Sequence, residues 1–476
     1  MKTKIHIGLI IFLLCYHELA AQQPINDKTV LTDTTAPANT SFIVGDIIIT
    51  GNKKTKAVII LREIPFQSGD EYELQKLVSK FEEGRKLLMN TSLFNHVVVA
   101  VQNFEGNKVN IIVDVKERWY LFPVPYFRPV DRNLNQWIVE QKGNLSRVNY
   151  GVKLLYNNAS GRNDKLRLLV IGGYTKQFSF SYDRLYIDKK LKWGMNMGFA
   201  IGNNREVNYN TINDKQVFIK DNDKYLRSFT NANVELTYRK AIKTRHRFGF
   251  RYTVEEVNDT IIALNPSYFK AGKNQIKFPG VYYSMSYFDL DYTPYPTKGY
   301  AADVFIGKYG FTSNTNLWSL SVRGSGNWHL SPKTFFTLNA FGGIKFPFNQ
   351  PYFNQRFLGY GDTFMQGYEY YVIDGVAGGY LKTTLTRELV DFNIRVPAKK
   401  GKEPKRIPVR IFGKTYGNTG YVHNPQPGEN QLSNKMLYSG GFGIDILTFY
   451  DVTFKFEYTF NQLGQNGLFL HRKSIF

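Results

Sequence analysis

Short runs in which apolar and polar residues alternate dominate the chain from residue 119 onward. The clearest is Val452–Phe460 (VTFKFEYTF), where an aromatic ring occupies every second position from Phe454 and the residues between are polar. A period of two residues indicates a β-strand with one apolar and one polar face. Runs of the same kind occur at 165–174, 177–186 and 247–254. Counting them predicts about sixteen antiparallel strands and no helix in this region.

These strands are expected to close into a barrel that spans a membrane. An apolar outer face suits lipid, a polar inner face suits water, and closure leaves no strand edge unpaired in the bilayer. The predicted turns are unequal, as in bacterial membrane barrels: Ser331–Lys333 is tight, whereas 203–224 and 350–375 are long. A large secreted β-sandwich is the alternative that the alternation leaves open.

The first 21 residues follow the order of a secretory signal peptide. Lys2 and Lys4 precede a short apolar stretch, Ile5–Tyr16, and small residues follow at 20 and 21. The stretch is shorter than the roughly 20 residues that a membrane-spanning helix needs, and no long apolar run follows it. Cys15, the only cysteine, lies inside it, so we expect a mature chain without disulfides, thiol catalysis or thiolate metal ligands.

Residues 42–118 predict a compact α+β domain with the order β-α-α-β-β. Phe42–Thr50 is rich in β-formers, and 55–63 and a segment that Asp70 can cap have apolar residues at helical spacing. Phe94–Val101 and Lys108–Val115 are strands on either side of a turn. The predicted organisation is a signal peptide (1–21), a flexible polar lead-in (22–41), this small domain (42–118) and the barrel (119–476).

Composition narrows the class of function. The chain has 32 Tyr and 37 Phe at a mean hydropathy of -0.33, which fits an apolar face built from alternate residues. Nearly all of the net charge of +22 falls after residue 118. In a soluble protein this surplus would suggest nucleic acid, but an export signal argues against that partner. Anionic outer-membrane lipid, including phosphorylated glycolipid, is the expected partner instead.

The titratable residues indicate no enzyme. The seven histidines are scattered, and no spacing of His, Asp and Glu resembles a metal site. Gly324-Ser325-Gly326 lacks the Gly-x-Ser-x-Gly pattern of a nucleophile on a strand-to-helix turn. We therefore expect neither catalytic residues nor a cofactor.

Several phrases resemble known families. The small domain resembles a POTRA (polypeptide-transport-associated) domain in ITGNKKTK (49–56), LLMNTSLFNHVVVAV (87–101) and VNIIVDVKER (109–118). DLDYTPYPTKGY (289–300) and QRFLGYGDTFMQGYEYY (355–371) resemble the BamA/TamA superfamily, also called the bacterial surface antigen family. The resemblance implies a POTRA domain in the periplasm and a sixteen-stranded barrel in the outer membrane of a Gram-negative bacterium.

The resemblance also assigns candidate functional residues. In the family, a loop folds into the barrel lumen and carries a Val-Arg-Gly-Tyr/Phe tip, whose arginine pairs with acidic groups on the inner wall. Here the tip reads Met365-Gln366-Gly367-Tyr368, so a neutral amide replaces the arginine and the ionic latch is expected to be missing. The residues of this loop that match the family are Arg356, Phe357, Gly361, Asp362, Gly367 and Tyr368. The rigid turn is carried by Pro294, Pro296 and Gly299.

Two strand edges are candidates for binding client polypeptides. In the family, the first and last barrel strands meet at a weakly paired seam, where a client strand could add by β-augmentation. The small domain offers a second edge at Phe94–Val101, centred on Val97, Val98 and Val99. The terminal Phe476 resembles the signal by which barrels are themselves recognised for assembly. The basic insert Pro397–Arg406 (PAKKGKEPKR) is expected to be a solvated turn or, alternatively, a loop that contacts lipid or a partner.

Three functions remain. The first is assembly and insertion of other outer-membrane proteins, with unfolded outer-membrane or secreted proteins as clients and accessory lipoproteins as further candidate partners. The second is a polypeptide translocation pore for a dedicated secreted partner. The third is a passive pore or a scaffold. The resemblance along the whole chain favours the first.

Overall fold

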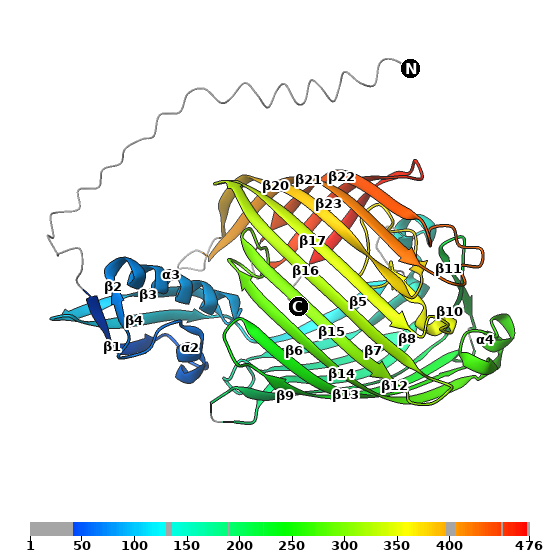
Figure 1. Ribbon diagram of the computed structural model, residues 1–476, viewed down its shortest axis with the longest axis horizontal. Helices are drawn as coiled ribbons and strands as arrows, with labels where there is room; N and C mark the ends of the chain where they lie inside the picture. Colours follow the sequence, from blue (N-terminus) through cyan, green and yellow to red (C-terminus); the bar gives the residue numbers. More distant parts are fainter. Residues whose placement is uncertain are drawn as a thin grey trace, which may run out of the picture.

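The computed structural model describes residues 41–129, 136–188, 190–221, 223–396, 405–448 and 451–473. They form a small α+β unit at one end of a large barrel (Figure 1). The predicted signal peptide (1–21), nearly all of the lead-in (22–41), most of the insert Pro397–Arg406 and the terminal Phe476 lie outside the described residues.

The small domain contains four strands and two helices: β1 (Ser41–Thr50), α2 (Ala57–Glu63), β2 (Glu71–Glu73), α3 (Leu74–Asn90), β3 (Phe94–Glu105) and β4 (Lys108–Glu117). Its sheet has the order β2-β1-β4-β3, in which β1 and β4 run parallel and the other pairs antiparallel. The predicted order β-α-α-β-β is present with one addition, the short strand β2.

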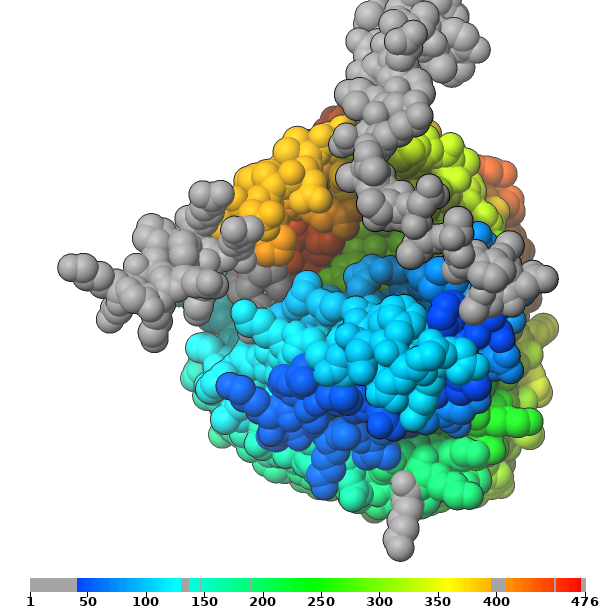
Figure 2. All heavy atoms as spheres, turned by 90° about the vertical axis from the view of Figure 1, so that its left-hand side faces the viewer, coloured from blue at the N-terminus to red at the C-terminus, as the bar shows by residue number. Residues whose placement is uncertain are grey.

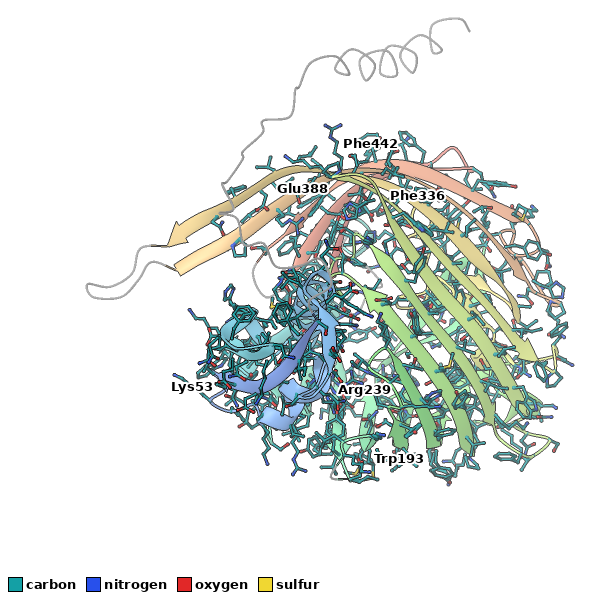
Figure 3. All side chains as sticks on the ribbon, turned by 60° about the vertical axis from the view of Figure 1, so that its left-hand side comes forward. Lys53, Trp193, Arg239, Phe336, Glu388 and Phe442 are labelled. Atoms are coloured by element: carbon teal, nitrogen blue, oxygen red, sulfur yellow. The ribbon has the colours of Figure 1, made fainter. Side chains whose placement is uncertain are left out.

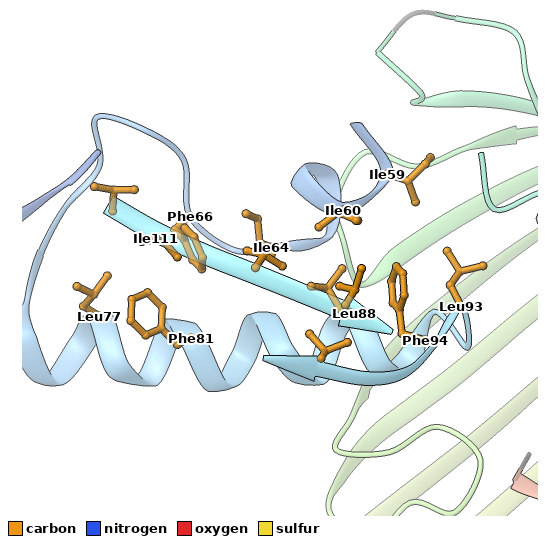
Figure 4. Close-up of a cluster of buried hydrophobic side chains, with 14 of the residues drawn as sticks. Ile59, Ile60, Ile64, Phe66, Leu77, Phe81, Leu88, Leu93, Phe94 and Ile111 are labelled. Carbon is orange, nitrogen blue, oxygen red and sulfur yellow. The ribbon is translucent and has the colours of Figure 1, made fainter. Parts of the chain in front are cut away.

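Apolar side chains of both helices pack against this sheet (Figure 4). Leu77, Phe81 and Leu88 recur at helical spacing along α3 and are buried, as are Ile59 and Ile60 of α2. The apolar spacing predicted for the helices is confirmed only in part, because Leu74 and Val78 of α3 and Val58 and Leu61 of α2 are exposed. One detail was wrong: the carboxylate of Asp70 does not cap α3. The segment after it forms β2, so Asp70 instead accepts hydrogen bonds from the Gln67 N–H (2.8 Å) and the Tyr72 hydroxyl (2.9 Å).

The barrel is one sheet of sixteen strands, which confirms the predicted fold. Its strands are β5 (Leu121–Pro129), β6 (Val148–Asn157), β7 (Lys165–Gly173), β8 (Thr175–Tyr186), β9 (Trp193–Asn204), β12 (Arg227–Tyr238), β13 (Thr244–Val257), β14 (Gln275–Leu290), β15 (Gly299–Tyr309), β16 (Leu317–Ser331), β17 (Thr334–Phe346), β20 (Ala377–Val396), β21 (Lys405–His423), β22 (Met436–Leu447), β23 (Thr453–Asn461) and β24 (Asn466–Lys473). Neighbours pair antiparallel in chain order. β5 and β24 stand at the two ends of this order, and no ladder joins them within the described residues.

The alternation read from the sequence matches the two faces of the barrel. Along β23, Phe454, Phe456 and Phe460 are exposed, whereas Glu457 and Thr459 are buried. Trp193 and Phe442 likewise lie on the outer surface (Figure 3). The outside of the sheet therefore carries apolar side chains and its inside polar ones, as in a barrel surrounded by lipid.

The two ends of the barrel differ. At the near end, against the small domain, most connections are short. At the far end, long segments add the hairpin β10 (Glu206–Ile212) and β11 (Lys215–Lys220), the helix α4 (Asp259–Leu264) and the pair β18 (Arg356–Leu358) and β19 (Ile373–Asp374). Short helical turns also occur at Gln136–Glu140, Leu145–Arg147, Lys270–Gly272 and Tyr352–Asn354.

The helix α4 corrects the prediction that only strands follow residue 118. The sequence feature that predicts this helix is Asn258, whose side chain caps α4 by accepting a hydrogen bond from the Thr260 N–H. None of the helices in the described part of the chain is long and apolar enough to cross a membrane.

Candidate functional site

Helix α2 of the small domain is held to the near end of the barrel by a buried ion pair. Glu63, the last residue of α2, accepts from Arg239, which directly follows β12, with 2.7 Å between Oε2 and Nη2. Arg62 adds a second guanidinium at 2.8 Å. Burial raises the pKa of a carboxyl, but the hydrogen bond and charge of Arg239, helped by Arg62, outweigh it and lower the pKa of Glu63 to about 2. Figure 3 shows Arg239 beside the small domain.

The end of α3 is docked on the turn between β14 and β15. The Asn90 side-chain amide donates to the Leu290 carbonyl (3.0 Å), and its carbonyl accepts from the Thr293 N–H (3.0 Å). Lys243, at the start of β13, lies 3.0 Å from Asp289 at the base of the same turn. Seen from this end, the small domain covers one side of the barrel mouth (Figure 2).

This turn carries the motif residues Pro294, Pro296 and Gly299. Gly299 has a φ of 108°, and a Cβ there would lie 2.0 Å from the Asp289 carbonyl oxygen, so only glycine fits. The sequence did not predict where the turn goes. Tyr295 between the two prolines enters the barrel, where its hydroxyl donates to Asp445 of β22 (3.0 Å) and its ring stacks on Phe412 of β21.

A buried ion pair lies close to the ends of the barrel sheet. Arg118, just before β5, donates from Nη1 to Asp451 Oδ2 at 2.7 Å, and both side chains are less than 10% exposed (9% and 7%). Asp451 belongs to the connection between β22 and β23. The pair therefore joins the chain that enters β5 to the connection that leads into β23, the strand paired with β24.

The loop between β17 and β20 (the lumen loop) packs inside the barrel sheet. Its tip packs on the inner wall: the Asn461 side chain of β23 donates to the Gly367 carbonyl (2.7 Å), and the Tyr368 hydroxyl donates to the Tyr438 carbonyl of β22 (3.1 Å). Gly367 has a φ of 89°, and a Cβ there would meet the Thr459 Cγ2 at 2.8 Å. The Gln366 side-chain oxygen is buried and has no hydrogen-bond partner among the described residues.

The base of the same loop holds the other matching residues. Arg356 lies in β18, which pairs with β19, and its guanidinium stands near the rings of Phe353 and Tyr360. Phe357 is buried beside Phe341 of the barrel wall. Gly361 adopts a φ of 59° with open space around it, and the neighbouring Asp362 is exposed. All of the matching residues from Arg356 to Tyr368 thus lie in this one loop, apart from the turn motif at 294–299.

The inner wall carries the positive charge that the loop tip lacks. Lys414 of β21 bridges two carboxylates, lying 2.5 Å from Asp445 Oδ1 and 2.7 Å from Glu457 Oε1, and all three side chains are buried. The charges of Asp445 and Glu457 are therefore balanced by a lysine of the barrel wall, Lys414. The tip contributes a different contact, in which Glu369 lies 3.4 Å from His471 of β24. Spacing did not reveal Lys414, because the register of β21, β22 and β23 brings Lys414, Asp445 and Glu457 together.

The far end of the barrel is crossed by loops. The β10–β11 hairpin, between β9 and β12, reaches the loop between β21 and β22, where Asp214 accepts from the backbone N–H of Gln431 (2.9 Å) and Leu432 (3.1 Å). These connections are half of the sheet apart, so the contact spans the mouth. Beneath it an apolar cluster joins the hairpin, α4 and the lumen loop through Val207, Ile261, Tyr268, Phe269 and Tyr352.

Comparison with known proteins bears on both parts of the chain. Residues 42–118 match the POTRA family model, described as a surface antigen variable number repeat. The chain also superposes on CdiB from Escherichia coli with a TM-score of 0.53 at 10% identity, over 90% of this chain and 75% of that chain. This chain contains a POTRA domain, followed by a β-barrel whose fold is similar to that of CdiB.

A second solved structure matches with a lower TM-score. BamA from Haemophilus ducreyi lacking POTRA domains 1–3 superposes with a TM-score of 0.47 at 16% identity, over 90% of this chain and 83% of that chain. At these identities the likeness to solved structures shows the fold alone. No curated protein sequence matches the chain. The POTRA domain and the large barrel indicate an outer-membrane protein of a Gram-negative bacterium.

The POTRA edge lies where the sequence placed it. Val97, Val98 and Val99 belong to β3, the edge strand of the POTRA sheet, and within the described residues only β4 pairs with it. Val97 points into the core and Val98 is exposed. Among the described residues no group of three or more His, Cys, Asp or Glu side chains is arranged to hold a metal ion.

Proposed function

We propose that this protein assembles and inserts other outer-membrane proteins. Client strands bind first along β3 of the POTRA domain, in the periplasm, and are then templated where β5 and β24 face each other. The observation that supports the proposal is that loops cover the far mouth of the barrel. There Asp214, between β10 and β11, accepts hydrogen bonds from Gln431 and Leu432 in the loop between β21 and β22.

The obstructed lumen favours a lateral route for clients. The far end is crossed by the β10–β11 hairpin, the lumen loop packs on β22 and β23, and the near-end turn inserts Tyr295. A chain passing along the barrel axis would have to displace all three, whereas a strand added at the sheet boundary displaces none. The same obstruction counts against a passive pore with steady conductance.

The POTRA domain is positioned to deliver clients. The Glu63–Arg239 pair and the Asn90 bridge fix it at the near mouth, so the edge strand β3 keeps one orientation relative to the barrel. An exposed edge offers unpaired backbone groups, and its affinity for an extended client comes from main-chain hydrogen bonds.

Depletion of the protein followed by quantitative proteomics of outer membranes tests the role directly. A broad loss of other barrel proteins supports a general assembly factor, and the loss of a few supports a dedicated one. No change in any other barrel, with loss of one secreted protein, would show the translocation pore instead. No change in any protein would favour a passive pore or a scaffold.

A crosslink across the far mouth separates the lateral route from the axial one. Cysteines at Lys215, which follows Asp214, and at Gln431, which bonds Asp214 through its backbone N–H, can be joined by a short thiol crosslinker because both side chains are exposed. We expect the locked protein to restore client assembly in depleted cells as well as the unlocked one does. The control is each single-cysteine variant with the same reagent. Loss of assembly in the locked protein alone would contradict the lateral route.

A further inference from the structure

The hairpin of β20 and β21 extends beyond the rest of the barrel at the near end. β17 pairs with β20 only as far as Arg387, and β22 pairs with β21 only as far as Arg410, although the two hairpin strands pair with each other out to Val396 and Lys405. The overhang of β20 is therefore Glu388–Val396, about 30 Å of strand at roughly 3.3 Å per residue. In Figure 3 Glu388 marks its start.

One face of this overhang is apolar and exposed. Val390, Phe392 and Ile394 stand on the same face and are 47%, 42% and 48% exposed, and they lie opposite Ile411, Val409 and Ile407 of β21. The other face is polar: Arg410 pairs with Glu388 and lies 3.8 Å from Asp391. A two-stranded ribbon with one apolar face needs something to cover that face.

A β-bulge sets which way this face points. The register between β20 and β21 shifts between Glu388 and Val390, which inserts Leu389 as an extra residue. Without the shift, Asp391 and Asn393 would continue the outer face of β20. With it, Val390, Phe392 and Ile394 continue the outward row of Leu381 and Leu385, both exposed to the surroundings of the barrel.

The apolar row is thus continuous with the surface that faces lipid. Leu385 pairs with Phe336, which stacks on Trp328, and the Trp328 indole donates to the Tyr300 hydroxyl. Aromatic side chains with a polar end mark the membrane–water boundary. The overhang carries the apolar row past this boundary, where an ordinary periplasmic hairpin would turn polar.

We propose that the β20–β21 overhang lies on the anionic phospholipid surface of the near-end leaflet, with Val390, Phe392 and Ile394 inserted among the head groups. The sequence at the tip of the hairpin supports an anionic partner, because Pro397–Arg406, which is the connection and the first two residues of β21, contains five Lys or Arg and one Glu. The proposal rests on the barrel spanning the membrane and is independent of the assembly role.

Fluorescence quenching tests the contact in the full chain refolded into vesicles. Cys15 is the only cysteine, so a Cys15→Ser chain with one added cysteine carries a single dye. Ile394→Cys and Asn393→Cys are the matched pair, because the two positions are adjacent and on opposite faces. The vesicles contain phosphatidylethanolamine and phosphatidylglycerol, with a nitroxide on the lipid chain as the apolar quencher and iodide as the aqueous one. Leu385→Cys is the reference for lipid contact.

We expect lipid nitroxide to quench the dye at 394 about threefold more than the dye at 393, and iodide to show the reverse order. In vesicles of phosphatidylcholine alone, the difference should shrink. Equal access of iodide to both positions would overturn the proposal. Shielding of position 394 from both quenchers would also overturn it, since it would show that protein covers the face. An equal effect in neutral vesicles would overturn the anionic specificity.

Discussion

Arg118 and Asp451 form a 2.7 Å ion pair that connects the start of β5 to the strands beside β24. β5 and β24 are the two ends of the barrel sheet, so this buried charge pair lies beside the boundary where client strands are proposed to add. Because both side chains are almost fully buried, either charge alone would be unfavourable. The pair is well placed to hold this boundary shut at its near end.

We expect Asp451→Asn to loosen the boundary. The change removes the carboxylate that pairs with the buried Arg118 Nη1, at a cost of about 3 kcal/mol. Hydrogen–deuterium exchange should accelerate in β5 and β24 before it does in β14, on the opposite wall. The control is Glu82→Gln, which breaks the exposed Arg85–Glu82 pair and should change stability by less than about 0.5 kcal/mol. Equal acceleration in β5 and β14 would contradict a local role.

Docking of the POTRA domain should weaken in acid. The pKa of Glu63 in the folded protein is about 2, below the ordinary 4.5, so its stabilising effect is complete above pH 4.5 and is lost as the pH falls towards 2. The difference corresponds to about 3 kcal/mol. Distances between spin labels at Lys76 and Lys333 should broaden across this window.

Glu63→Gln provides the matched variant for this experiment. It cannot be ionised, so its distances should already be broad at neutral pH and should change little between pH 4.5 and 2. If acid broadens the distances only in the unsubstituted chain, the response comes from the carboxylate of Glu63. The same acid-dependent broadening in the Gln variant would assign the response to another group.

The wall lysine is expected to replace the family's loop arginine. Lys414→Met leaves Asp445 and Glu457 buried without their cation and should lower the unfolding temperature of the barrel, by the equivalent of about 3 kcal/mol. Adding Gln366→Arg should restore part of this loss, because the tip packs beside Thr459 on the same face of β23. The unfolding temperatures of the single and the double variant can be measured by the heat-dependent shift of the barrel band in gel electrophoresis. Lys308→Met at the far end is the control, and no restoration in the double variant would contradict the replacement.

The close approach of the lumen loop depends on Gly367. Gly367→Ala puts a methyl group 2.8 Å from Thr459 and should release the tip, seen as faster hydrogen exchange in residues 364–372. Gly361→Ala has a similar positive φ in open space and should cost only the backbone strain, about 1 kcal/mol. If both variants released the tip equally, strain and not the wall contact would explain the effect.

The sequence by itself predicted most of the local structure. The period of two identified β23 and its two faces, the helical spacing of Leu77, Phe81 and Leu88 identified α3, and both motif loops were located. Such features follow from a residue and its near neighbours, because side-chain alternation and helical spacing repeat over a few positions. Two predictions about helices failed. Asp and Asn are both good N-cap residues, but Asp70 does not cap a helix, whereas Asn258 caps α4.

Only the tertiary structure decided how distant parts meet. Tyr295 and Asp445 are 150 residues apart in the sequence, and Glu63 and Arg239 are 176 apart. No sequence feature of one partner predicts a contact with the other. The curvature of the sheet brings β21, β22 and β23 beneath the lumen loop, and a one-residue bulge at Leu389 turns the apolar row outward. Alternation specifies the two faces of each strand, but the register, the bulges and the closure of the sheet determine which residues on those faces come into contact.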